Sequence, residues 1–200
     1  MKAVYVKENN TMKHFIFGIN EKNNGIDSEE YQFNSIEIVG NKGFQNPWNI
    51  KRLFFDEKLM IIEKDAFKDC SELEVFCCGK ISESESDAIM NLEVNKLEIR
   101  KNSTNENDEV KTDFIVQTLA FSGCENLHTI VFPECSKLII EKYAFKNCSS
   151  LRTVITFADE IFFTENPFDD CPKELTFICK NDNTQIARFA RENGYGVINV

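Results

Sequence analysis

Apolar residues along this chain occur in short groups whose spacing returns several times. The segment "KDAFKDCSELEVF", residues 64–76, places Ala-Phe first, a Cys three residues after the Phe, a Leu three residues further on, and then Val-Phe. The spacing around Ala-Phe-x-x-Cys predicts a tight helical turn, and the stretch from Leu73 to Phe76 predicts a short strand. One occurrence does not distinguish an amphipathic helix from a turn followed by a strand. The other occurrences of the pattern decide between them.

The same pattern begins at five positions: Gly43, Ala66, Ala120, Ala144 and Pro167. The intervals between these starts are 23, 54, 24 and 23 residues. A period near 23 residues predicts one coil of a solenoid per copy, because one coil cannot bury its own apolar face but stacked coils can. The 54-residue interval is interpreted as two periods plus an insertion, with a degraded copy from Ala88 forming an irregular third coil. The insertion is then the polar stretch 101–110, whose Asn-rich, charged sequence cannot pack a core.

Each position of the repeat has a predicted role. Segments such as "LHTIVF" (127–132) and "LRTVIT" (151–156) are predicted strands of one parallel sheet along the solenoid. The Ala-Phe-x-x-Cys segment is predicted to turn on the opposite wall, with Phe in the interior and Cys as a compact buried residue with a weak donor. Eighteen Phe against one Trp and four Tyr fit a recurring slot shaped for Phe. The runs 59–62 and 138–140 supply further inward apolar residues.

This series of apolar-x-x-Ala-Phe-x-x-Cys-x-x-Leu units resembles the BspA-type leucine-rich repeat over about residues 36–180. The resemblance implies an α/β, β-dominated fold: a right-handed leucine-rich-repeat solenoid of about six coils of ~23 residues, with a parallel sheet along one face and a cap at each end. The chain departs from the family pattern at Pro47, which replaces Cys in the first copy, and in the third copy, which lacks the motif. The family contains surface-exposed and interaction proteins of bacteria and some protists, without a shared enzymatic activity. The resemblance therefore implies binding rather than catalysis.

The chain, residues 1–200, is predicted to form one domain whose ends cap the stack. The expected N-terminal cap is 1–35, with strands at 4–6 and 14–19. The expected C-terminal cap is 181–200, a helix that begins at Asp182 or Thr184 and stops at Gly194. The expected apolar stripe of this helix is Ile186, Phe189 and Ala190, and the residues expected to close the last coil are Val197, Ile198 and Val200.

The net charge of −10 disfavours nucleic acid and anionic membranes as partners, because both attract clustered Lys and Arg. No segment approaches the roughly 18 apolar residues of a membrane span, and residues 1–30 hold no apolar run of signal-peptide length. The expected partner is another protein, and the acidic charge favours a basic one. The expected location is the cytoplasm as the chain stands, or the cell surface or exterior if a leader has been removed.

The eight cysteines form no C-x-x-C pair, which disfavours a zinc site. Stacked Cys70, Cys124, Cys148 and Cys171 would lie about 4.8 Å apart, but parallel side chains do not converge on a disulfide, so buried free thiols are expected.

His128 follows Cys124 by four residues, which could indicate a Cys–His nucleophile, yet on a strand start it would face away from the buried thiol. The acidic run 82–87 is expected to be a solvated loop rather than a cation site. No catalytic residue, metal or cofactor is therefore expected.

The outward side of the predicted strands is the expected partner-binding surface. A row that mixes Arg, His, Phe and aliphatic side chains suits a protein partner better than a small ligand. The predicted contact residues are Lys51, Arg52, Phe54, Glu74, His128, Thr129, Arg152 and Thr153, with Val75, Cys77, Val131 and Ile155 beside them. A rival interpretation assigns recognition to the insertion 101–110, because binding residues often lie on loops held by a rigid scaffold.

Two binding functions remain open, and no constellation of residues argues for an enzyme. The first is a non-catalytic protein–protein interaction module that acts as an intracellular inhibitor or immunity-type binder, favoured by the acidic charge and the missing leader. The alternative is a cell-surface adhesin or host-interaction protein, favoured by the family resemblance alone.

Overall fold

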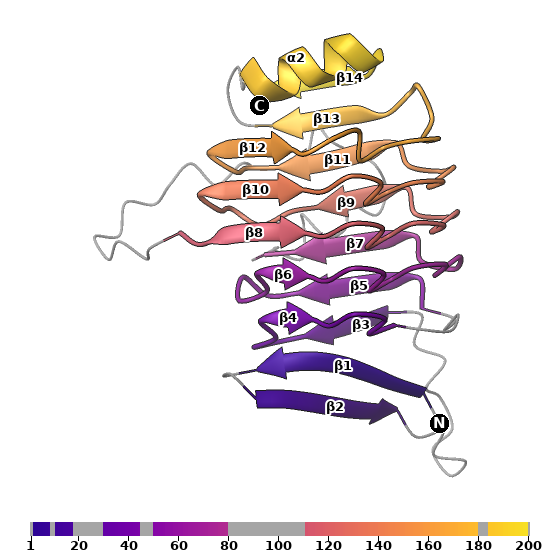
Figure 1. The fold of residues 1–200 in the computed structure, drawn as a ribbon, viewed down its shortest axis with the longest axis vertical. Helices are drawn as coiled ribbons and strands as arrows, with labels where there is room; N and C mark the ends of the chain where they lie inside the picture. Colours follow the sequence, from indigo (N-terminus) through magenta and orange to yellow (C-terminus); the bar gives the residue numbers. More distant parts are fainter. Residues whose placement is uncertain are drawn as a thin grey trace.

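The computed structural model describes residues 2–8 and 11–17 as backbone, and residues 30–44, 50–79, 111–179 and 184–199. Within these residues the chain coils repeatedly through two seven-stranded sheets, which form the two walls of a solenoid (Figure 1). This architecture is the solenoid of stacked coils that the repeat predicts.

The first wall, sheet B, is parallel throughout. Its strands run in register, one per coil, along the whole stack. They are β3 (Glu30–Phe33), β5 (Arg52–Phe55), β7 (Val75–Cys78), β9 (Thr129–Val131), β11 (Thr153–Thr156), β13 (Thr176–Cys179) and β14 (Gly196–Asn199). Five of them, β5, β7, β9, β11 and β13, are the strands that the Leu-x-x-Ile/Val segments predict, whereas β3 and β14 lie in the expected caps.

The second wall, sheet A, differs from the sequence prediction, which gives the solenoid a single parallel sheet. Its parallel strands are β4 (Ile38–Val39), β6 (Ile61–Ile62), β8 (Asp113–Val116), β10 (Lys137–Ile140) and β12 (Glu160–Phe163). The antiparallel hairpin of β1 (Lys2–Glu8) and β2 (Thr11–Phe17) joins its edge through β1 and β4. The apolar runs before each Ala-Phe therefore form strands of their own.

The Ala-Phe-x-x-Cys segment is a turn rather than a helical turn. In each of two copies the residue before Ala and the residue before Cys adopt positive φ, as at Asp65 and Asp69 (56° and 60°) and at Tyr143 and Asn147 (57° and 60°). Gly123 takes the second of these positions with φ of 78°, and a Cβ there would lie 2.5 Å from Oδ1 of Asp69 on the preceding coil. Two left-handed residues reverse the chain sharply, so that the Phe between them points into the core.

The Phe of each copy stacks on the Phe of the next. Ring centroids in the column Phe44–Phe67–Phe121–Phe145–Phe168 are 4.6, 4.8, 5.1 and 5.2 Å apart, with interplanar angles of at most 25°. All five side chains are at most 1% exposed. This column forms the centre of the core, and it explains why Phe recurs in the sequence at this period.

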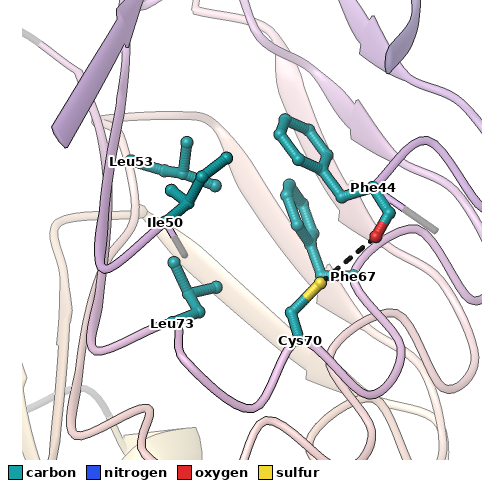
Figure 2. Close-up of a pocket in the computed structure, with 6 residues that line it drawn as sticks. All are labelled: Phe44, Ile50, Leu53, Phe67, Cys70 and Leu73. Carbon is teal, nitrogen blue, oxygen red and sulfur yellow. Dashed lines mark hydrogen bonds between the residues drawn. The ribbon is translucent and has the colours of Figure 1, made fainter. Parts of the chain in front are cut away.

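The repeated Cys connects neighbouring coils through its thiol. The Sγ atoms of Cys70, Cys124, Cys148 and Cys171 donate to the carbonyl oxygens of Phe44, Phe67, Phe121 and Phe145 at 3.1–3.3 Å. Figure 2 shows the first of these bonds beside the stacked rings of Phe44 and Phe67. Each thiol thus satisfies a carbonyl of the preceding coil, a role that a purely apolar residue of similar size could not fill.

The predicted third coil is wrong. Strand β7 pairs directly with β9, β6 pairs directly with β8, and the Phe67 amide donates to the Ala120 carbonyl at 2.7 Å. No coil fits between copies that are hydrogen-bonded to each other. Residues 79–112 instead connect β7 to β8 within one coil, a connection of 34 residues where residues 56–60 connect β5 to β6 with five. The 54-residue interval is therefore one period plus an insertion of 34 − 5 = 29 residues; the predicted copy at 88–99 and the stretch 101–110 lie outside the described residues.

The ends of the stack follow the prediction in part. Helix α2 (Thr184–Asn193) buries Ile186 and Ala190 completely and ends in a Schellman motif at Gly194, whose φ is 76°. The Tyr195 amide donates to the Ala190 carbonyl at 2.8 Å in this motif. Ile198 does not close the last coil, because it lies on the outer side of β14 and is 43% exposed. Strand β3 lies inside the expected N-terminal cap but already belongs to sheet B; Asp182 and Val200 lie outside the described residues.

Candidate binding surfaces

Four predicted contact residues occupy equivalent positions immediately before the strands of sheet B. We call Lys51, Glu74, His128 and Arg152 the strand-start row. Backbone bonds link its members across coils: the His128 amide donates to the Glu74 carbonyl at 2.9 Å, and the Arg152 amide to the His128 carbonyl at 3.0 Å. Lys51 Nζ lies 4.0 Å from Glu74 Oε1. The row therefore joins four consecutive coils, with His128 and Arg152 on adjacent ones.

The charges of this row are held in defined positions. The exposed Arg152 guanidinium donates to the carbonyls of Ser149 and Leu151, both at 3.3 Å. His128 is half-buried, with Nδ1 2.9 Å from the Thr129 hydroxyl. Desolvation lowers the pKa of His128, and the nearby Glu74 carboxylate opposes part of this effect. The imidazole is therefore neutral at pH 7, and Arg152 supplies the positive charge of this pair.

The middle of the predicted strand face is closed. Thr129 and Thr153 are 1% and 9% exposed, so the prediction that they contact a partner is corrected. The apolar side chains beside them form a second buried cluster, distinct from the core and at most 6% exposed: Val75, Cys77, Val131, Ile155 and Ile178. Phe54 and Phe157 pack against this cluster and are only partly buried. Arg52 is engaged at 3.1 Å by Glu30 of the preceding coil. The accessible part of the predicted site is therefore the strand-start row with Phe54.

The thiols are not arranged for nucleophilic chemistry. All eight cysteines are free, with Cys70 and Cys171 half-buried and the other six buried. Burial raises the pKa of Cys70 and Cys171 to about 12 and that of Cys124 well above its usual value. Cys124 donates to Phe67 and His128 contacts Thr129, so the two side chains have separate partners. Among the described residues, no group of three or more His, Cys, Asp or Glu side chains could hold a metal ion.

Two hollows formed by described residues differ in what they could hold. The first is an apolar cavity of ≈ 10 Å³ between the coils of Phe44 and Phe67, lined also by Leu53 and Leu73 (Figure 2). It has room for about one water-sized sphere and cannot hold a ligand. The second is a groove of ≈ 360 Å³ between β12 and α2. Its apolar lining is Ile161, Phe162, Phe163 and Phe189, and its polar lining is Glu165, Gln185, Arg188 and Glu192.

The outer face of sheet A was missed in the sequence interpretation. Five side chains, one from each parallel strand, form a continuous row that we call the sheet A ladder: Ile38, Ile61, Ile115, Ile139 and Phe162. Each is partly exposed, and Phe162 reaches 41%. The signal was present in the runs 59–62 and 138–140, where consecutive apolar residues cannot all point inward in a strand.

A parallel stack of coils, with one strand on each wall and one Phe in a common column, defines a solenoid repeat protein. The chain belongs to the BspA type leucine rich repeat region family, which it matches in 6 copies over residues 23–112 and 111–195. No curated protein and no solved structure matches the chain. Within the described residues, no helix is long and apolar enough to cross a membrane.

Proposed function

We propose that this chain is a non-catalytic protein-binding module that contacts its partner through the strand-start row and Phe54. The observation that carries the proposal is the row itself: four equivalent positions on consecutive coils present charged or polar side chains at fixed spacing. Arg152 is exposed, and its guanidinium is already positioned by two carbonyls. Arg is enriched among the residues that dominate protein–protein affinity, and less side-chain entropy is lost when it is positioned in advance.

The chemistry of the thiols supports a binding role. The hydrogen-bonded thiols with raised pKa carry little of the thiolate that a nucleophile requires. The same free thiols, together with the net charge of −10, favour a reducing compartment and a basic partner. Of the two roles, an intracellular inhibitor or immunity-type binder is therefore the one we propose, ahead of a surface adhesin.

The experiment is a purification of tagged protein from its native host, followed by a binding titration with the isolated partner. The test variant carries Arg152→Glu and His128→Glu. Its matched control, Lys173→Glu with Asn193→Glu, makes the net charge more negative by the same three units at positions away from the row. A third variant deletes residues 102–109. All must retain the wild-type melting transition before binding is compared.

We expect the double variant to lose partner binding at least tenfold, about 1.4 kcal/mol, while the control and the deletion variant bind as wild type. Loss of binding only in the deletion variant would transfer recognition to the insertion between β7 and β8. Partner turnover or covalent modification by the wild-type protein would contradict the non-catalytic assignment.

A further inference from the structure

The outward apolar side chains of the two sheets differ in how exposed they are. On sheet B the apolar outward side chains are at most 6% exposed, from Val75 through Ile178. On sheet A the equivalent row, the ladder from Ile38 to Phe162, is partly exposed at every strand. Parallel sheets are normally covered on both faces, because their outward residues are apolar as well as their inward ones. Among the described residues, the sheet A ladder is thus an apolar row on a parallel sheet that is more exposed than its counterpart on sheet B.

The ladder is continuous from strand to strand, and the strand spacing sets its length. Its five rungs are in register, each being the direct partner of the next across neighbouring strands. Four steps of about 4.8 Å give a row of about 19 Å. This is the length of about 13 residues of α-helix at 1.5 Å per residue. A helix with one apolar stripe has the shape to cover such a row.

The C-terminal end of the ladder leads into the groove between β12 and α2. Phe162 is both the last rung and part of the groove lining. Phe163 and Phe189 lie beside it with ring centroids 4.1 Å apart. A groove of ≈ 360 Å³ with this aromatic lining can take a large apolar side chain as an anchor.

Charge on both sides of the ladder selects the partner. One border of the ladder runs along the N-terminal ends of the sheet A strands. There Lys137 lies directly between Asp113 and Glu160 in the strand register. Its Nζ is 5.1 Å from the ring centre of Phe162. The other border runs along the C-terminal ends of these strands, and its acidic residues are Glu63 and Glu141. Within these two rows, four carboxylates stand against one ammonium, and Lys111 beyond them is paired with both Glu134 and Asp159. The border is therefore acidic, and an acidic border favours Lys and Arg beside the partner's apolar stripe.

The same charges argue against a second copy of this chain as the occupant. A copy placed face to face would bring an acidic border against an identical acidic border. Like-charge juxtaposition costs several kcal/mol across an interface. A basic partner with an apolar stripe can pack on the ladder and pair its charges with the acidic border.

We propose that the outer face of sheet A binds a basic amphipathic helix of another protein, with apolar side chains along the sheet A ladder and one anchored in the groove at Phe162. This surface is separate from the strand-start row, which belongs to the other wall (Figure 1). The proposal therefore goes beyond the proposed function and gives the chain a second interaction surface.

The test uses three 14-residue dye-labelled peptides and full-length protein, with binding measured by fluorescence anisotropy. The first peptide is a helix with Leu on one face and Lys on the other. The second has the same composition in scrambled order, and the third has Glu in place of Lys. Protein variants are Ile139→Thr and Phe162→Ala. The matched control is Ile198→Thr, which changes an equally β-branched residue that is 43% exposed on the other sheet.

A second pair of variants tests the charge. Asp113→Asn with Glu160→Gln removes two carboxylates beside the ladder. Glu125→Gln with Glu174→Gln removes two exposed carboxylates from the turns that precede strands of sheet B. Hydrogen exchange with and without the basic amphipathic peptide then identifies the protected strands.

We expect the basic amphipathic peptide to bind more tightly than the other two peptides and to protect β8, β10 and β12. Phe162→Ala should weaken binding of this peptide about tenfold, and Ile139→Thr should weaken it several-fold. Ile198→Thr and the double variant Glu125→Gln, Glu174→Gln should leave its binding unchanged. Equal binding of the scrambled peptide, or equal loss with Ile198→Thr, would overturn the proposal in favour of general attraction to an acidic surface. Absence of peptide binding also overturns it, as does a wild-type dimer that Phe162→Ala dissociates.

The Arg152→Glu, His128→Glu variant separates this proposal from the proposed function. It should bind the basic amphipathic peptide at least as tightly as wild type, since it changes only the other wall. Loss of peptide binding in this variant would contradict a separate surface on sheet A.

Discussion

Replacing Phe145 by Ala removes the fourth of the five rings of the Phe column and is the most direct test of the fold. The Phe145 side chain is 0% exposed, and its ring stacks on Phe121 at 5.1 Å and on Phe168 at 5.2 Å. Truncating a buried Phe costs about 3–5 kcal/mol. Each stacked pair contributes about 0.5–1.5 kcal/mol beyond its buried area, and this substitution removes two pairs.

The surrounding backbone limits how far the cavity can collapse. The Phe145 amide donates to the Pro167 carbonyl at 2.9 Å, and the Phe145 carbonyl accepts from the Cys171 thiol at 3.1 Å. Coils fixed by these bonds cannot close over the missing ring. We therefore expect a loss near the upper end of the range, about 4–5 kcal/mol. For a domain of this size the corresponding decrease in Tm is about 8–20 °C.

The assay is thermal and urea denaturation followed by circular dichroism, with Phe162→Ala as the matched control. Phe162 lies on β12 and is 41% exposed, so its truncation should cost about 1 kcal/mol or less. If Phe145→Ala and Phe162→Ala lower the stability equally, the column does not form the centre of the core and the repeat register is wrong.

Three further predictions follow from the titratable groups. Native protein should show few thiols reactive toward a disulfide reagent and eight after denaturation, because every cysteine is free and at least half-buried; eight fast-reacting thiols in the native state would contradict this. The free energy of unfolding should fall as the pH rises above 9. The unfolded chain releases thiol protons near the usual pKa of 9.0, whereas the folded protein keeps the protons of Cys70, Cys135 and Cys171 up to a pKa of about 12. Between these two pKa values, each of the three thiols lowers the free energy of unfolding by about 1.4 kcal/mol per pH unit. A constant urea midpoint between pH 8 and pH 10.5 would rule this out. The pKa of His128, followed by NMR, should lie below its ordinary value because of burial, and it should fall further in Glu74→Gln because the carboxylate raises it. A wild-type pKa at or above the ordinary value would contradict the effect of burial, and a rise in Glu74→Gln would contradict the effect of the carboxylate.

The sequence predicts the repeat and the residues of the core because these requirements recur in every coil. A Phe in a common column and a thiol that reaches the preceding coil must be supplied by each copy, so they appear as Ala-Phe-x-x-Cys at a regular period. The terminal helix is predictable for a similar reason, since its buried stripe and its Gly stop are local signals.

The tertiary structure decides what a period alone leaves open. The 54-residue interval fits two coils or one coil with an insertion, and only the pairing of β7 with β9 shows that Ala66 and Ala120 belong to adjacent coils. The two-residue strands β4 and β6 are too short to show the alternation that identifies a strand, so sheet A emerges only from its pairing along the stack.

The candidate binding site divides in the same way. The alternation of residues predicts that Thr129 and Val131 share the outward face of a strand, and they do. Whether an outward face is accessible depends on what packs over it, which is a property of the folded molecule and not of the strand. Thr129 and Thr153 are therefore buried where the pattern suggested contact, while Ile139 and Phe162, interpreted only as core residues or not at all, remain partly exposed. The sequence by itself determined the solenoid, and packing between its parts decided which of its faces a partner can reach.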